Sequence, residues 1–240
     1  MAQLSTPYID IHTHNHWGDS GALNTCRIPD QQPPAGHAYT VGIHPWDAEQ
    51  IPSTDSSYYQ DLLIHSLTTS CIAIGEIGLD YTTAKSSEQK QQQQFWLEWQ
   101  LQVATERSLP VIIHCVKAYN ELIEVLKKHP NTTSIIHGYI GSPELANRLL
   151  QSGCYLSFGP RTWASPKTQQ ALQHVPLDRL FFETDDSQRS ITEIYALATE
   201  TTGQSLQTLQ KATANNVQHI FGSTSFLISK VFTTNTALQS

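Results

Sequence analysis

Short runs of consecutive hydrophobic residues recur along the chain and are separated by longer polar stretches. Most of these runs are apolar throughout rather than alternating, which is typical of parallel strands that are buried on both faces. We therefore predict eight strands, at Tyr8–His12, Leu23–Ile28, Thr40–Ile43, Ile72–Ile77, Val111–His114, Ser134–His137, Tyr155–Phe158 and Leu180–Glu183.

Helical patterns lie between the later strands. Over residues 87–107, Phe95, Trp99 and Val103 recur every four positions and share one face of an otherwise Gln-rich helix. The glutamine run at 89–94 is interpreted as the solvated face of that helix. Three further helix signals are an apolar pattern over Tyr119–His129, a proline at a helix start in Ser142-Pro143-Glu144, and capping-box spacing in Ser190-Ile191-Thr192-Glu193.

Strands and helices that alternate along a chain predict crossover units, and eight such units form a (β/α)8 barrel of the TIM type. The chain between His14 and Thr40 is too short for a helix, a strand and their loops, so we expect the first crossover helix to be shortened or missing. A single barrel domain is predicted over residues 1–222. The tail at 223–240 is rich in Ser, Thr and Asn, and we expect it to be partly disordered.

The charge of the chain limits its partners. The formal net charge is −7 at pH 7. Proteins that hold long duplex nucleic acid by its backbone usually show a basic footprint, so extended duplex binding is not expected. Contact with one or a few phosphates stays open, because bound divalent cations supply positive charge that the net charge does not count.

Cysteine spacing and hydropathy indicate the compartment. The four cysteines show no C-x-x-C spacing and are interpreted as buried thiols in a reducing environment. No hydrophobic run approaches the ~18 residues of a membrane-spanning helix, and the first residues lack a signal-peptide pattern. We therefore expect a cytoplasmic protein with no membrane partner, and the oligomeric state stays open.

Possible metal ligands lie at or just after the C-terminal ends of five predicted strands, where (β/α)8 enzymes carry their active sites. Two histidines one residue apart, as in the segment 8–14, direct both imidazoles to the same face of a strand. A carboxylate inside an apolar strand, as at Glu76, is costly to bury unless it is paired or bound to a metal. The candidate ligands are His12, His14, Glu76, His114, His137 and Asp185.

Each candidate also has a purely structural alternative. Glu76 could pair with an arginine, and His114 and His137 could be hydrogen-bonded core histidines. Asp185 could hold a metal, orient a water molecule and accept its proton. Glu183 competes for that role but lies two residues earlier in its strand, where contact with a metal ligand is favoured over contact with the metal.

Several segments form a recognisable pattern when they are taken together. They are Asp10-x-His12-x-His14, Gly42-Ile43-His44-Pro45, Gly75-Glu76-Ile77-Gly78-Leu79-Asp80, Pro110-Val111-Ile112-Ile113-His114-Cys115, Glu183-Thr184-Asp185 and the stretch from Asn216 to Phe221. In content and order they resemble the TatD family, metal-dependent hydrolases of the amidohydrolase-like barrel class, many of them deoxyribonucleases. The resemblance runs from about Tyr8 to Gly222, and the chain is similar to the compact, shortened members of that family.

The resemblance implies a binuclear centre with two divalent metal ions, Zn, Mg or Mn. His12 and His14 would be ligands of one ion, and His114 and His137 ligands of the other. Glu76 would bridge the two ions.

The resemblance also implies that Asp185 is a ligand that activates the water molecule, so Glu76 and Asp185 are the expected catalytic residues. Two segments depart from the usual family pattern. His137-Gly138-Tyr139 stands where His-Cys-Phe is usual, and Asp185-Asp186-Ser187 stands where Asp-Ala-Pro is usual. Both departures, and the shortened region after His14, leave the choice of substrate open.

Three residues are candidates for contact with substrate. His44 follows the third strand and could donate to a substrate phosphate, or it could be a loop histidine that holds backbone. Lys117 lies three positions after His114, near enough to meet an anionic group. Tyr139 belongs with Trp46, Tyr81 and Trp163 to a set of aromatic residues that could stack against bases or pack ordinarily.

The predicted activity is phosphodiester hydrolysis by a TatD-type deoxyribonuclease that works exonucleolytically on single-stranded DNA ends. A different ester or amide substrate is an alternative, for example in the removal of D-aminoacyl groups from tRNA. A non-catalytic metal-binding barrel that acts as a scaffold is a third hypothesis. A cluster of buried polar ligands disfavours the scaffold, because such a cluster is costly to keep without a use.

Overall fold

The computed structural model describes residues 6–15, 21–29 and 37–222. All eight predicted strands are present, and most begin and end within two residues of the prediction. They are β1 (Asp10–Thr13), β2 (Ala22–Arg27), β3 (Tyr39–Gly42), β4 (Cys71–Asp80), β5 (Val111–Val116), β6 (Ser134–Ile136), β7 (Tyr155–Phe158) and β8 (Leu180–Phe182).

Helices lie between the later strands, as predicted. They are α1 (Pro45–Ala48), α2 (Ser56–Ser66), α3 (Ser87–Arg107), α4 (Tyr119–Leu126), α5 (Pro143–Gln151), α6 (Pro166–His174), α7 (Ile191–Thr202) and α8 (Leu206–Phe221). The bounds of α3 match the prediction, and Ser190 caps α7 through the predicted capping box. The strands are parallel and follow one another in chain order, which is the topology of the predicted barrel class.

Two predictions concern residues outside the described ranges. The shortened or missing first crossover helix falls on a connection whose residues 16–20 are not described, and the tail at 223–240 is not described either. The described residues form two compact units. Residues 6–15, 21–24, 138–150 and 155–222 make up the first, and residues 25–29, 37–137 and 151–154 the second. The single domain over residues 1–222 stays a prediction.

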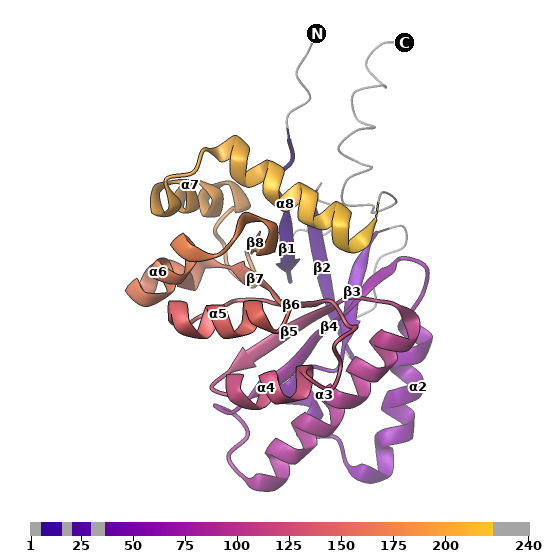
Figure 1. Ribbon diagram of the computed structural model, residues 1–240. Helices are drawn as coiled ribbons and strands as arrows, with labels where there is room; N and C mark the ends of the chain where they lie inside the picture. The colour runs from indigo at the N-terminus through magenta and orange to yellow at the C-terminus, as the bar shows by residue number, and fades with distance from the viewer. Residues whose placement is uncertain (1–5, 16–20, 30–36, 223–240) are drawn as a thin grey trace, which may run out of the picture. The chain divides into compact units, whose positions relative to one another are not determined.

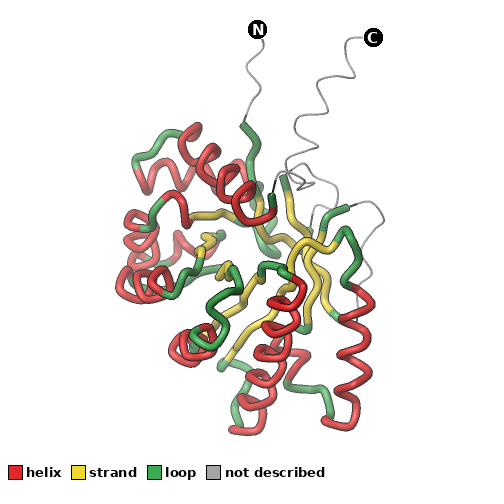
Figure 2. Tube along the Cα trace, turned by 45° about the vertical axis from the view of Figure 1, so that its right-hand side comes forward, coloured by secondary structure: helices red, strands yellow, loops and turns green. Residues whose placement is uncertain are grey.

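The second unit contains β3 to β6 with α1 to α4. Helices α2, α3 and α4 pack against β3, β4 and β5, and Figures 1 and 2 show these helices alongside the strands. Apolar side chains from β3, the ends of β2 and β4, and helices α1 to α3 form its core. Its buried members are Cys26, Ile28, Tyr39, Val41, Ile43, Ala48, Ile51, Leu63, Cys71 and Trp96.

Two glycines allow β4 to approach β5 closely on either side of Glu76. A Cβ atom on Gly75 would lie 2.6 Å from Cβ of Ile112. Gly78 has a φ of +146° and passes so close to the His114 carbonyl that no side chain fits there. The close approach brings the carboxylates of β4 within reach of the histidine on β5.

The first unit contains β7, β8, β1 and the start of β2, with most of α5 and with α6 to α8. β7 pairs with β8, and Thr13 of β1 pairs with Asp185 just after β8. Asn216 of α8 donates through its side-chain amide to the carbonyls of Leu177 and Leu180, at 2.9 and 3.0 Å. This contact fixes α8 to the start of β8 and accounts physically for an asparagine in the C-terminal motif.

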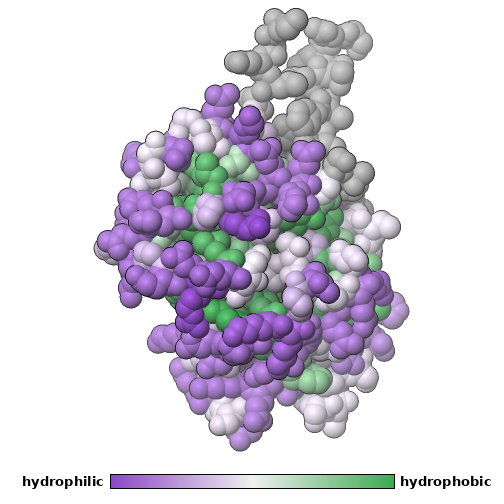
Figure 3. Space-filling view, viewed as in Figure 1, coloured by the Kyte–Doolittle hydropathy of each residue, from purple (hydrophilic) through white to green (hydrophobic). Residues whose placement is uncertain are grey.

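Polar side chains cover most of the face shown in Figure 3, and apolar side chains show between them in small areas. Five large hydrophobic side chains are exposed among the described residues: Trp46, Tyr58, Phe95, Ile140 and Leu206. Among the helices that the structure describes, none is both long enough and apolar enough to span a bilayer.

Candidate metal centre

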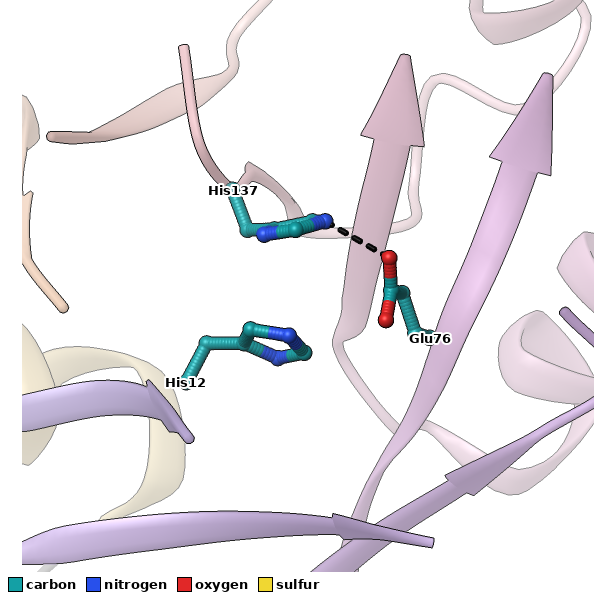
Figure 4. A group of neighbouring side chains, drawn as sticks. All are labelled: His12, Glu76 and His137. Atoms are coloured by element: carbon teal, nitrogen blue, oxygen red, sulfur yellow. Dashed lines mark hydrogen bonds and ion pairs between the residues drawn. The ribbon is translucent and has the colours of Figure 1, made fainter. Parts of the chain in front are cut away.

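A buried carboxylate on β4 brings three imidazoles of the second unit together. Oε1 of Glu76 lies 2.8 Å from Nδ1 of His114. The same oxygen lies 2.8 Å from Nε2 of His137, the contact drawn in Figure 4. It also lies 3.2 Å from Nε2 of His44. The two ring nitrogens of His114 and His137 are themselves 3.3 Å apart. We call Glu76, His114 and His137 the Glu76 cluster.

The donor atoms of the Glu76 cluster fit a divalent metal ion. Two imidazole nitrogens and a carboxylate oxygen are typical ligands of Zn²⁺. Ligands bound about 2.1 Å from one ion in a tetrahedral arrangement lie about 3.4 Å apart. The two nitrogens are 3.3 Å apart, and the carboxylate oxygen lies closer to each of them, at 2.8 Å. Nitrogen lone pairs that face each other and a carboxylate need a cation or a proton between them.

The Asp80 carboxylate contacts the ring nitrogen of His114 that faces away from Glu76. Its Oδ2 lies 3.3 Å from Nε2 of His114 and accepts from Nε1 of Trp46 at 2.8 Å. Thr82 donates to Oδ1. Burial alone would raise the pKa of the Asp80 carboxyl, but these hydrogen bonds outweigh it and hold the pKa far below its usual range. An ionised Asp80 accepts the hydrogen bond that Nε2 of His114 donates. The lone pair on Nδ1 of His114 therefore faces Glu76 and His137.

The pKa of His114 responds to the same contacts. Burial lowers this pKa, but hydrogen bonds to Asp80 and Glu76 outweigh burial and raise it above its ordinary value. Without a metal ion, a proton is therefore favoured at this position. A bound divalent cation would take the place of that proton on Nδ1.

His44 is buried and contacts the cluster rather than solvent. The backbone N–H of Trp46 donates to Nδ1 of His44 at 3.2 Å, so the ring proton lies on Nε2 and is donated to Glu76. Burial lowers the pKa of His44 by more than Glu76 raises it. His44 therefore orients Glu76 in this structure, and its contact with a substrate phosphate stays a prediction.

The first unit holds a second group of ligand atoms, which we call the Asp185 cluster. Oδ1 of Asp185 lies 3.7 Å from Nε2 of His12 and 3.6 Å from Nε2 of His14. The two imidazole rings are perpendicular, with centroids 5.0 Å apart. One ligand atom from each of these residues lies within 4.8 Å of the others. The donor set is again two nitrogens and one oxygen, which suits the same class of ion.

Backbone pairing places the Asp185 carboxylate between the two histidines. The N–H of Asp185 donates to the carbonyl of His12 at 3.0 Å, and the carbonyl of Asp185 accepts from the N–H of His14 at 3.1 Å. Asp185 adopts a φ of 56°, a left-handed conformation that side chains other than glycine rarely take. Strain of this kind is typical of functional sites that the surrounding structure fixes.

Asp10 joins the strand before the histidines to the segment that carries Asp185. Its Oδ1 accepts from the N–H of Thr184 at 2.9 Å, and its Oδ2 accepts from the Thr184 hydroxyl at 2.7 Å. Asp10 is almost fully buried, and burial raises its pKa to about 7 against the opposing effect of the Thr184 hydrogen bonds. The carboxyl group therefore positions Asp185 through its neighbour.

The raised pKa of Asp10 predicts a pH-dependent stability of the metal-stripped protein. The folded state keeps the Asp10 proton up to about pH 7, whereas the unfolded state releases it near 3.8. The folded state thus binds more protons in this window, and the free energy of unfolding falls as the pH rises through it. Asp10→Asn removes this contribution. Urea unfolding at pH 5 and pH 7.5 should show a smaller loss for the variant than for the parent, and equal losses would contradict the assignment.

The Asp80 contact predicts a change in metal affinity. Asp80→Asn cannot accept fully from both His114 and Trp46, so His114 loses its fixed tautomer. We expect Zn²⁺ to bind the Glu76 cluster roughly 10- to 100-fold more weakly, the range found for groups that orient metal ligands. Competition with a chromophoric chelator measures the change. Asp61→Asn, an exposed residue of α2, is the matched control and should leave the affinity unchanged.

The structure brings the six predicted ligands into two groups of three, the Asp185 cluster and the Glu76 cluster. The sequence did not identify Asp80 or Asp10 as parts of the site, although both lie in the quoted motifs. Glu183 is completely buried beside Gly159, and its supporting role stays a prediction.

The residues predicted to contact substrate differ in their exposure to solvent. Lys117 follows β5 directly, with a φ of 54°. Its side chain is exposed and therefore accessible to a ligand. Tyr139 is completely buried, and its hydroxyl donates to the Ser142 carbonyl at 2.7 Å. Its ring therefore offers no exposed face for stacking against a base. Trp46 is 45% exposed, which keeps it available to a ligand.

The amino-acid sequence matches a protein family and several known proteins. Residues 24–222 match the family described as TatD related DNase. The uncharacterized metal-dependent hydrolase YabD of Bacillus subtilis is 35% identical over 149 residues, or 60% of this chain and 56% of YabD. The 3'-5' ssDNA/RNA exonuclease TatD of Pectobacterium carotovorum is 32% identical over 61% of this chain and 56% of that relative. Human deoxyribonuclease TATDN3 is 30% identical over 60% of this chain and 56% of its own length. The chain thus matches little more than half the length of each of these relatives.

Solved structures confirm the fold class. The TatD homologue YjjV of Escherichia coli has a TM-score of 0.70 at 25% identity, and the match covers 83% of this chain and 85% of YjjV. A TatD family hydrolase of Entamoeba histolytica has a TM-score of 0.77 at 17% identity, over 91% of this chain and 99% of that one. Together with the order of the eight parallel strands, this likeness establishes a (β/α)8 barrel of the TIM type.

Proposed function

Because the chain belongs to the TatD-related DNase family, we propose that it is a metal-dependent hydrolase that cleaves phosphodiester bonds at single-stranded DNA ends. The observation that carries the proposal is the arrangement of donor atoms. Each of the two clusters offers two imidazole nitrogens and one carboxylate oxygen to a divalent ion. Such donor sets are used by metal-dependent hydrolases.

The proposal assigns one ion to each cluster. His12, His14 and Asp185 would hold the first, and the Glu76 cluster the second, with Glu76 as the bridging carboxylate. The sequence pattern of the family supports the bridge, as does the ability of a carboxylate to offer two oxygens. Zn²⁺ suits the nitrogen-rich donor sets, and Mn²⁺ and Mg²⁺ suit phosphoryl chemistry.

The protein residues have distinct parts in the proposed reaction. Divalent ions lower the pKa of water and polarise phosphoryl oxygens when they are bound. Asp185 accepts the proton of the attacking water, since it is a partly exposed carboxylate between two imidazoles. His44 orients Glu76 by donating a hydrogen bond, and the exposed ammonium of Lys117 can meet an anionic group of the substrate.

The net charge of −7 favours a short substrate segment over a long duplex. The relative from Pectobacterium carotovorum is named as an exonuclease of single-stranded DNA and RNA. RNA ends therefore belong beside DNA ends in the test.

Cleavage of end-labelled oligonucleotides tests the proposal. The protein is stripped of metal, resupplied with Mg²⁺, Mn²⁺ or Zn²⁺, and given single-stranded DNA, single-stranded RNA and blunt duplex. We expect a metal-dependent ladder on the single strands and much slower loss of the duplex. Two bound ions without cleavage of any oligonucleotide would contradict the nuclease activity and direct the search to other esters and amides.

A further inference from the structure

Two completely buried glutamines of α3 pair with the backbone at the ends of two strands. Oε1 of Gln93 accepts from the N–H of Asp80 at 2.8 Å, and Nε2 of Gln93 lies 3.2 Å from the Asp80 carbonyl. Gln100 repeats the arrangement at Ile43, accepting from its N–H at 2.7 Å and donating to its carbonyl at 3.1 Å. Each side-chain amide thus bonds both backbone groups of one residue, as a neighbouring strand would.

Gln93 differs from the other glutamines of the run that contains it. The sequence interpretation places residues 89–94 on a solvated face, and that interpretation is wrong for Gln93, whose side chain has no exposed surface. Gln93 and Gln100 lie seven positions apart, two turns of helix, and therefore project from the same face of α3. A capping box of Ser86 and Gln89 fixes the start of the helix.

The residues that the two amides hold are those that support the Glu76 cluster. Asp80 accepts from Nε2 of His114, and Ile43 directly precedes His44, which donates to Glu76. Gln93 also donates to Oε2 of Glu49, at 2.9 Å, just after α1. One face of α3 is therefore hydrogen-bonded to both segments that orient the ligands.

We propose that Gln93 and Gln100 are positioning residues of the metal centre, acting through Asp80 and His44, respectively. The inference rests on the metal binding in the proposed function. Glutamine suits the task because its amide offers a donor and an acceptor side by side, matching the carbonyl and N–H of one residue. Glutamate keeps the acceptor and lacks the donor, and methionine lacks both while filling a similar volume.

Metal binding rather than cleavage tests the inference. The full-length Gln93→Met and Gln100→Met variants are titrated with Zn²⁺ against a chelator, and their Co²⁺ forms are compared by visible absorption. Gln102→Met on the same helix is the matched control, since Gln102 is exposed and bonds only Glu106 among the described residues. We expect a roughly tenfold loss of Zn²⁺ affinity and a shifted Co²⁺ spectrum for the two buried positions, and neither change for the control.

A double-mutant cycle separates positioning from stability. If Gln93 acts through Asp80, Gln93→Met should cost little further affinity in an Asp80→Asn background. The corresponding background for Gln100 is His44→Ala. Lower stability of the metal-free variants with unchanged affinity and Co²⁺ spectrum would overturn the inference, and so would full additivity in the cycles.

The remaining outcomes of the experiment also decide the question. Should Gln93→Met not fold, Gln93→Glu keeps the bond from the Asp80 N–H, and the same affinity and spectrum decide the question. Absence of metal binding by the parent would overturn the proposed function together with this inference. Normal binding by the parent with unaltered variants would overturn this inference alone.

Discussion

Glu76→Gln is expected to lower phosphodiester cleavage about a thousandfold. Polarisation by a metal ion contributes several kcal/mol to transition-state stabilisation, and about 4 kcal/mol corresponds to this factor. The variant keeps the size of the side chain but removes the negative charge that faces three imidazoles within 3.2 Å. Without that charge the cluster carries no anion to balance a divalent cation. Initial rates on a labelled single-stranded oligonucleotide, with bound metal measured on the same samples, check the prediction.

The control for this variant is Glu98→Gln. Glu98 is a carboxylate of α3 that pairs with Lys128 at 3.0 Å at the surface, and its neutralisation should leave the rate unchanged. Cleavage by Glu76→Gln at more than a tenth of the parent rate would contradict the role assigned to Glu76.

Asp185→Asn is expected to lower the rate by about 10²- to 10⁴-fold, the range typical of a lost general base. The amide cannot accept the proton of the attacking water, and it would offer a weaker oxygen to an ion held by His12 and His14. The carbonyl and N–H of residue 185 still pair with β1, so the segment should keep its place. Initial rates on a labelled single-stranded oligonucleotide, with bound metal measured on the same samples, check the prediction.

Asp186→Asn provides a matched control, because Asp186 is the adjacent carboxylate and is exposed. We expect the parent rate from it. Cleavage by Asp185→Asn at close to the parent rate would contradict the role assigned to Asp185.

Most of the strands were predictable because they are compact apolar runs, the pattern typical of parallel strands that are buried on both faces. The six candidate ligands could be selected for a related reason. A charged or imidazole side chain that ends such a run stands out against its neighbours, and the C-terminal ends of parallel strands lie at one edge of a sheet. The resemblance to a known family assigned roles to the same residues.

The supporting residues were harder to predict because their roles depend on contacts between distant segments. Asp80 reaches His114 only because Gly75 and Gly78 let β4 approach β5. Gln93 lies in a run of glutamines in which no local signal separates a buried amide from exposed ones. The burial of Tyr139 likewise follows from its packing and from its bond to Ser142, neither of which the sequence shows.

The most direct test of the central claim counts metal ions and measures cleavage on the same samples. Stripped protein is titrated with Mn²⁺ or Zn²⁺, bound metal is determined by elemental analysis, and cleavage of a single-stranded oligonucleotide is followed at each point. The account predicts two ions per chain, with activity that follows the binding of the second. It also predicts one ion in His14→Ala and one in His114→Ala. Full activity with one ion or none, or two ions bound with no cleavage of single strands, would contradict it.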